Sequence, residues 1–192
     1  MIAVPLIARR LLLREMQAGD WRFVQTLQAE SDSHAPAEVR RTEQAAREFV
    51  QRVMAQQAEQ PRTTYRFVIV LRAAQRPIGW CDLYVREADA GEAEIGFRVD
   101  ARYWGCGYAT EAAWLMVTFA FDRLGVQQVW GECAPDNHAS SRVMQKLGMQ
   151  PCRSTTHQRD GGDVLVYALR SDVRQAGLLR LDCGQEATST GG

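Results

Sequence analysis

The feature that most constrains the fold is a strand, a glycine-containing loop, a long helix and a second strand in direct succession over residues 92–133. Residues 92–99 alternate polar and apolar side chains, as the two faces of a half-buried strand do. A largely apolar helical pattern runs from Tyr108 to about Leu124, and residues 126–133 resemble another strand. This order predicts one strand–helix–strand crossover in the second half of the chain.

Strand and helix patterns flank this crossover on both sides. Strands are expected at Tyr65–Leu71 and Ile78–Arg86, which form an antiparallel meander with residues 92–99. A separate, earlier strand is expected at Leu11–Arg14. Two more strands are expected near Gln150–His157 and Asp163–Arg170. The remaining helices are expected from an Asp20 N-cap to about Ala29, from Thr42 to before Pro61, and over residues 139–147. A single domain over residues 1–175 with a polar tail at 176–192 follows from this pattern.

The loop ahead of the long helix has the geometry of an anion site. The first amides of a helix lack internal partners and carry partial positive charge, and Gly105 and Gly107 allow close approach of the backbone to an anion. Arg102 could add a charge on the same rim. A P-loop would need a lysine that this loop lacks, and a dinucleotide-binding loop would need a small residue where Thr110 stands.

Composition excludes several other classes of function. Lys+Arg and Asp+Glu both number 23, so no basic excess supports nucleic-acid binding. The longest apolar stretches, such as 114–121, are too short to span a bilayer, so no membrane association is expected. The five cysteines form no C-x-x-C pair and the three histidines are scattered, which argues against disulfides and against any metal site. A reducing cytoplasmic location fits this usage best.

Several separated motifs resemble the Gcn5-related N-acetyltransferases (GNAT). Arg102-x-x-Gly105-x-Gly107 matches the acyl-CoA diphosphate motif of that family. The run from Tyr103 to Ala112 is similar to the branch that contains the ribosomal-protein N-terminal acetyltransferases (RimJ and RimL). The same branch commonly carries Asn-x-x-Ser and Lys-Leu-Gly, which are found here at 137–140 and 146–148.

The resemblance implies a GNAT fold of the α/β (α+β) class. Its sheet is mixed, mostly antiparallel and six- to seven-stranded, with flanking helices and two splayed central strands that hold the pantetheine arm of acetyl-CoA, the cosubstrate. It also implies direct acetyl transfer to an amine. By position, the cofactor-binding residues would be Phe97, Arg98, Val99, Arg102, Gly105, Cys106, Gly107, Tyr108, Ala109, Thr110, Asn137 and Ser140.

Acetyl transfer needs a base for the ammonium and a group that stabilises the departing thiolate. Glu94 is the expected base, with Glu92 as the alternative, because Glu94-Ile-Gly-Phe97 resembles the strand that bears the base in the histone-modifying branch. Ser140 is the expected thiolate partner, and Tyr108 and Tyr167 are alternatives. Ser141 leaves open which hydroxyl faces the thiol. A backbone amide near Phe97 or Arg98 would stabilise the oxyanion.

The sequence therefore predicts an acetyl-CoA-dependent N-acetyltransferase, with a protein N-terminal amine as acceptor. A small-molecule amine (polyamine, amino acid or antibiotic) and a catalytically silent acyl-CoA-binding regulator are the alternatives. Acceptor specificity is expected from loop 31–41, the start of the helix that begins at Thr42, and the turn at 158–162. The terminal strands could pair two copies into a homodimer.

Overall fold

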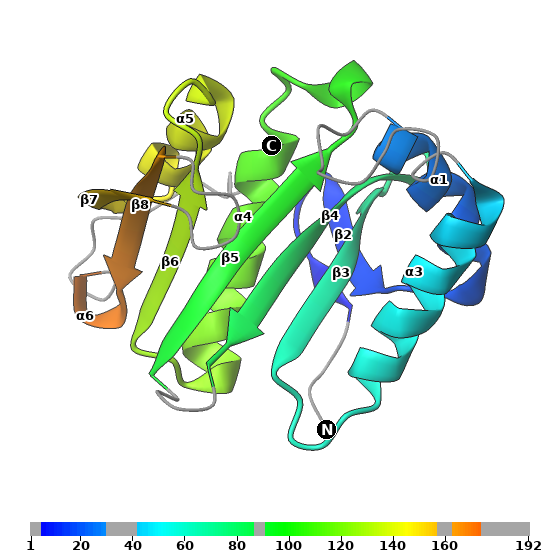
Figure 1. Cartoon of the computed structure of the whole chain (residues 1–192), viewed down its shortest axis with the longest axis horizontal. Coiled ribbons are helices and arrows are strands. Elements are labelled where there is room, and N and C mark those ends of the chain that lie inside the picture. Colours follow the sequence, from blue (N-terminus) through cyan, green and yellow to red (C-terminus); the bar gives the residue numbers. More distant parts are fainter. Residues whose placement is uncertain (1–4, 30–41, 87–90, 157–162, 174–192) are drawn as a thin grey trace, which may run out of the picture.

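All strands in the described part of the chain form one sheet. A computed structural model describes residues 5–29, 42–86, 91–156 and 163–173. The sheet is eight-stranded, in the order β1-β2-β3-β4-β5-β6-β8-β7, and every neighbouring pair is antiparallel except β5 and β6 (Figure 1). The prediction of a mixed, mostly antiparallel sheet with flanking helices is therefore confirmed, although the sheet has eight strands where six to seven were expected. None of the helices in the described ranges is long and apolar enough to cross a membrane.

The strands are β1 (Leu6–Ile7), β2 (Leu11–Glu15), β3 (Thr64–Leu71), β4 (Arg76–Val85), β5 (Glu92–Val99), β6 (Gln128–Cys133), β7 (Gln150–Thr156) and β8 (Asp163–Arg170). The α-helices are α1 (Trp21–Ala29), α3 (Glu43–Gln57), α4 (Tyr108–Phe119), α5 (His138–Lys146) and the short α6 (Ser171–Val173). The 3-10 helices are η1 (Ala18–Asp20) and η3 (Ala101–Tyr103), and the π-helical segment η4 (Ala120–Leu124) extends α4.

Helices cover both faces of the sheet. The α4 face is a core in which Phe119 packs edge-on against Tyr65 and Phe67 of β3. The opposite face carries a smaller core of α1 and α3 side chains, in which Phe23 and Phe49 contact Trp80 of β4. In β2 and β3, alternate residues thus enter different cores, which is the period-two pattern of a strand that is covered on both faces.

Most predicted elements lie within a few residues of their expected ends, and three differ. The strand β1 was not predicted, because two residues are too few to show an alternation of polar and apolar side chains. The predicted helix 108–124 changes to π-helical geometry from Ala120. Asp20 was expected to cap a helix by itself, but its buried carboxylate accepts from the Arg14 guanidinium at 2.7 and 2.8 Å and from the Gln17 amide.

The sheet opens between β5 and β6. The two strands are paired only at Glu92↔Gln128, Ala93↔Val129 and Glu94↔Trp130, although both continue further. Figure 1 shows their ribbons spreading apart toward their C-terminal ends. The splayed central strands that the resemblance implied are therefore present, and they leave a gap beside the N-terminal ends of α4 and α5.

Candidate active site

A cavity of about 610 Å³ occupies the open end of the sheet. Its walls come from the end of β5, the loop ahead of α4, the first turn of α4 and one side of α5, and Leu27 of α1 also contributes. This volume is typical of a small-molecule site. Because α4 and α1 cover opposite faces of the sheet, the cavity reaches both faces, as a site for two substrates requires.

The glycine loop and the first turn of α4 form one wall of this cavity. Gly105 (φ +74°) and Gly107 (φ +79°) have left-handed backbone conformations, which side chains of L-residues disfavour. Gly107 directly precedes α4, whose first amides have no partner within the helix. Both glycines, Tyr108, Ala109 and Thr110 line the cavity. This wall can therefore present backbone N–H groups to an anion.

A long-range contact holds this loop in place. The Arg10 guanidinium, just before β2, donates to the Glu111 carboxylate of α4 at 2.7 Å and to the Cys106 carbonyl at 3.0 Å. Its amide donates to the same carboxylate at 2.9 Å, and its guanidinium lies 4.6 Å from the centre of the Tyr108 ring. No sequence pattern indicates this contact, because 101 residues separate Arg10 from Glu111.

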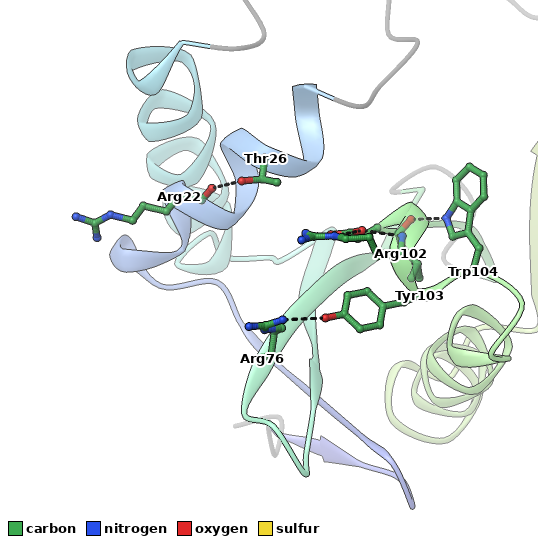
Figure 2. A network of polar contacts seen from close by, with 8 residues as sticks. Arg22, Thr26, Arg76, Arg102, Tyr103 and Trp104 are labelled. Atoms are coloured by element: carbon green, nitrogen blue, oxygen red, sulfur yellow. Dashed lines mark hydrogen bonds and ion pairs between the residues drawn. The ribbon is translucent and has the colours of Figure 1, made fainter.

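Two side chains of the same loop point in opposite directions. The Trp104 indole N–H donates to the Val99 carbonyl at 2.7 Å, and the ring, 67% exposed, lines the cavity. Arg102 extends instead toward α1 and binds the Asp100 carboxylate (Figure 2). These hydrogen bonds from Arg102 hold the pKa of the buried Asp100 carboxyl below its ordinary value. Arg102 thus stabilises the turn and does not line the cavity.

The free edge of β5 presents backbone groups to the gap. The amide of Asp100 donates to Ile78 and the carbonyl of Glu92 accepts from Arg86, so the even-numbered residues of β5 pair with β4. By the alternation of an antiparallel ladder, Phe97 and Val99 direct their backbone groups toward β6. The pairing with β6 has already ended there. Of the two amides considered for the oxyanion, that of Phe97 therefore faces the gap and that of Arg98 faces β4.

The N-terminal end of α5 contributes polar groups opposite this edge. Asn137 caps the helix by accepting from the Ser140 amide at 3.0 Å, so Ser140 is not the capping residue. Asn137, Ser140 and Tyr108 line the cavity. The Ser141 hydroxyl lies 2.7 Å from the Tyr167 hydroxyl of β8, and neither residue lines the cavity. Of the two adjacent serines, Ser140 is the one at the site.

Glu94 lies on the sheet face that α1 and α3 cover, opposite Tyr84 of β4 and Trp130 of β6. Beside it, Gly96 faces the buried Asp82, and a methyl group at Gly96 would lie 3.7 Å from the Asp82 carboxylate. Burial raises the pKa of the Asp82 carboxyl, although the nearby Arg66 guanidinium opposes the shift. The indole nitrogen of Trp130 is buried, and within the described chain it has no hydrogen-bond partner.

The structure brings most of the predicted residues to one cavity. Those that line it are Phe97, Arg98, Val99, Gly105, Gly107, Tyr108, Ala109, Thr110, Asn137 and Ser140. Arg102, Cys106 and Glu94 do not line it, and Glu92 accepts a hydrogen bond from Gln128 at 3.3 Å. Loop 31–41 and the turn at 158–162, where acceptor specificity was expected, lie outside the described residues, as does the predicted tail.

Two cations of α5 that the sequence analysis did not assign to the site, Arg142 and Lys146, also line the cavity. Their spacing of four residues places them on one side of the helix. That spacing was visible in the sequence, but only the placement of α5 shows which surface they face.

Comparisons with known proteins agree with this geometry. A family profile described as "Acetyltransferase (GNAT) domain" matches residues 10–150. An uncharacterised N-acetyltransferase of Bacillus subtilis, YnaD, is 31% identical over 144 residues, which cover 74% of this chain and 80% of that protein. The crystal structure of a GNAT-family acetyltransferase from Bacillus anthracis has a TM-score of 0.73 at 26% identity, covering 88% of this chain and 99% of that one. RimL, a ribosomal L7/L12 α-N-protein acetyltransferase in complex with coenzyme A, has a TM-score of 0.74 at 17% identity, covering 85% and 96%.

Proposed function

The chain belongs to the GNAT family of acetyltransferases, and from this membership we propose that the acceptor of its acetyl-CoA-dependent transfer is the N-terminal amine of a protein. Members of this family use acetyl-CoA as the donor. The observation that carries the proposal is the cavity at the open edge of β5, which joins the glycine loop on one side to α1 on the other.

The described residues fit acetyl-CoA in the family's manner. Amides of the glycine loop and of the first turn of α4 would bind the diphosphate. The backbone of Phe97 and the amide of Val99, open toward β6, would hold the pantetheine arm as a strand would. The Val99 carbonyl accepts from the Trp104 indole. Ser140 would hydrogen-bond the departing thiolate, and the Phe97 amide would bind the oxyanion. Bound acetyl-CoA would supply the activated acetyl thioester, and CoA would leave as the thiolate.

The acceptor would enter from the α1 face. Glu94 of β5 would remove the proton from the ammonium, directly or through a water molecule. Gly96 beside it has no side chain, and a β-carbon there would meet only the Asp82 side chain within 4 Å. Holding the amine against the thioester would itself supply much of the rate acceleration.

The charge balance on this face favours a peptide over a polyamine. A polyamine carries several ammonium groups and needs several unbalanced carboxylates, but Asp82 is paired with Arg66 and Arg98 lies over Trp80. A peptide N-terminus carries one ammonium followed by carbonyl groups. The buried and unpartnered N–H of Trp130 is a donor that such a carbonyl could satisfy. RimL acts on a protein N-terminus, which supports the same acceptor class.

The proposal is tested by incubating the protein with labelled acetyl-CoA and three acceptors. These are a peptide with a free N-terminus, the same peptide with a blocked N-terminus and an internal lysine, and spermidine. Mass spectrometry should find acetylation at the free N-terminus. Turnover of spermidine or lysine alone would contradict the proposed acceptor.

Two variants and their neighbours test the roles assigned to the site. Glu94→Gln should lower kcat about 100-fold, whereas Glu92→Gln should have little effect.

Ser140→Ala should lower kcat about 10- to 100-fold, because one hydrogen bond to a developing charge is lost. Ser141→Ala is the matched control, since the Ser141 hydroxyl contacts Tyr167 outside the cavity. Equal losses for the two serine variants would remove Ser140 from the mechanism.

A further inference from the structure

The lining of the cavity is positively charged although the chain as a whole is not. Its charged members are Arg98, Arg142 and Lys146, all cations, and no carboxylate lines the cavity within the described residues. The whole chain has equal numbers of basic and acidic residues, 23 of each. A lining of one sign in a neutral protein concentrates anions. The mechanism proposed above uses neither Arg142 nor Lys146.

These two cations belong to one surface of α5. They lie four residues apart, so their side chains are neighbours on the helix, and Val143 between them also lines the cavity. Lys146 is the only lysine in the chain. Neither side chain takes part in an ion pair or hydrogen bond anywhere in the described structure. Both charges are therefore available to a ligand.

The opposite side of α5 is packed in the core, and this packing holds Arg142 and Lys146 toward the cavity. Met144 and Leu147 are buried in the core on the α4 face, 2% and 0% exposed. The hydrogen bond between Ser141 and Tyr167 ties the helix to β8, and Gly148 ends it with φ +75°. With its apolar side anchored, α5 cannot rotate its cations away from the cavity.

The ligand of the cavity carries two separate phosphate groups. The diphosphate is matched by the loop amides, which offer partial charges and close approach. The second group is the 3′-phosphate on the ribose of coenzyme A, a phosphomonoester that carries nearly two negative charges at neutral pH, by analogy with other phosphomonoesters. Two flexible side chains with full positive charges suit such a group better than amides do.

We propose that Arg142 and Lys146 form the binding site for the 3′-phosphate of coenzyme A. The enzyme would thereby distinguish acetyl-CoA from thioesters that lack this phosphate, including acetyl groups on the phosphopantetheine arm of a carrier protein. The inference rests on acetyl-CoA binding in this cavity and is independent of the acceptor amine.

The test compares coenzyme A with dephospho-coenzyme A, which differs only in the 3′-phosphate. Calorimetry on the wild-type protein should give a preference for coenzyme A of about 10- to 100-fold, as expected for charge-assisted hydrogen bonds. Arg142→Gln and Lys146→Gln should each reduce that preference, and the double variant should bind both ligands within about twofold. Affinity for dephospho-coenzyme A should stay unchanged, and Lys146→Arg should retain the preference.

Arg123→Gln is the control, because Arg123 is an exposed arginine of η4 outside the cavity. If the variants weaken both ligands equally, the two cations bind the diphosphate or only stabilise α5, and the proposal is wrong. It is also wrong if the wild-type protein does not discriminate. A protein that binds neither ligand would contradict the cofactor site itself, whereas variants that bind dephospho-coenzyme A normally show that the diphosphate site is intact.

Discussion

Gly107 combines a left-handed backbone with a place on the cavity wall. A β-carbon there would lie 3.5 Å from the Arg10 guanidinium, beside the amides that face the cavity. Gly107→Ala should therefore destabilise the fold by about 1 kcal/mol through backbone strain and also weaken coenzyme A binding. Thermal unfolding and calorimetry measure the two effects separately.

Gly125→Ala is the matched control for this substitution. Gly125 has φ +70°, and an added β-carbon would meet nothing within 4 Å. Its variant should show the same strain without any loss of coenzyme A affinity. Equal affinity losses in the two variants would mean that Gly107 matters only through global stability.

Asp100 makes a pH-dependent contribution to stability. Its folded-state pKa lies below the unfolded value of about 3.9, because Arg102 donates hydrogen bonds to the carboxylate. The stabilisation is therefore present above that value and is lost as pH falls through the lower, folded-state pKa. Asp100→Asn should lower the unfolding free energy by about 1 kcal/mol at pH 7, a modest figure because Arg102 is largely exposed.

Denaturant titrations at several pH values measure this difference, which should shrink below about pH 4. Asp172→Asn serves as the comparison. Its partner Arg170 lies 3.3 Å away and both side chains are exposed, so we expect a smaller loss. A difference for Asp100→Asn that persists unchanged at pH 3 would show that the carboxylate's charge is not responsible.

Arg102 illustrates where sequence reasoning at single residues fails. The motif predicted a cation on the rim of the cofactor site, but the guanidinium turns to Asp100, two residues earlier. The glycines were easier to interpret, because a left-handed conformation is a property of the residue itself. The direction of a long side chain depends on its neighbours in space, which the motif does not specify.

Among the elements, the contact between the start of β2 and α4 has a functional consequence. Arg10 donates to the Cys106 carbonyl, and in a trans peptide the following N–H, that of Gly107, points the opposite way. Arg10 would therefore position the amides that are proposed to bind the diphosphate. Arg10→Ala should raise the KM for acetyl-CoA about tenfold while leaving the KM for S-acetylpantetheine, which has no diphosphate, nearly unchanged.

Arg62→Ala is the control for this prediction. Arg62 binds Glu15 of β2 at 2.7 Å and does not line the cavity. Arg62→Ala should lower stability without changing the KM for acetyl-CoA relative to the KM for S-acetylpantetheine. If Arg10→Ala impairs both donors in parallel, Arg10 supports the fold only and does not shape the diphosphate site.

The elements themselves were well predicted because their signals are local. The alternation at β5 and the apolar stripe of α4 depend on neighbouring residues, and the structure retains both. Asp20 was misassigned because its partner, Arg14, lies on the preceding strand. The contact between Arg10 and Glu111 was out of reach for the same reason, since no pattern links residues so far apart in sequence.

For the whole molecule, the opening of the sheet is the feature that periodicity could not reveal. Nothing in the alternation of β5 or β6 marks Glu94↔Trp130 as their last pair, and only the resemblance to a known family implied the gap. In the structure, Gly131 lies just after the last pair, and a β-carbon there would lie 3.1 Å from the Ile95 carbonyl. Close approach at this point is followed by divergence.

This opening predicts a distinct pattern of amide hydrogen exchange. In the free protein, Phe97 and Val99 face the gap without a strand partner, so their amides should exchange quickly. Coenzyme A, with its pantetheine arm, should slow both amides about tenfold or more. Adenosine 3′,5′-bisphosphate, which lacks the arm, should give them no protection beyond the global stabilisation at equal occupancy. Exchange measured by mass spectrometry or NMR reports these amides individually.

The comparison must separate local protection from global stabilisation, because any ligand that binds only the folded state stabilises all of it. Val68, in the fully paired β3, reports the global effect. Protection of Phe97 and Val99 should exceed that of Val68 with coenzyme A and should match it with the bisphosphate. If the bisphosphate protects Phe97 and Val99 as strongly as coenzyme A does, the arm does not lie along β5, and the gap between β5 and β6 is not the acetyl-transfer channel.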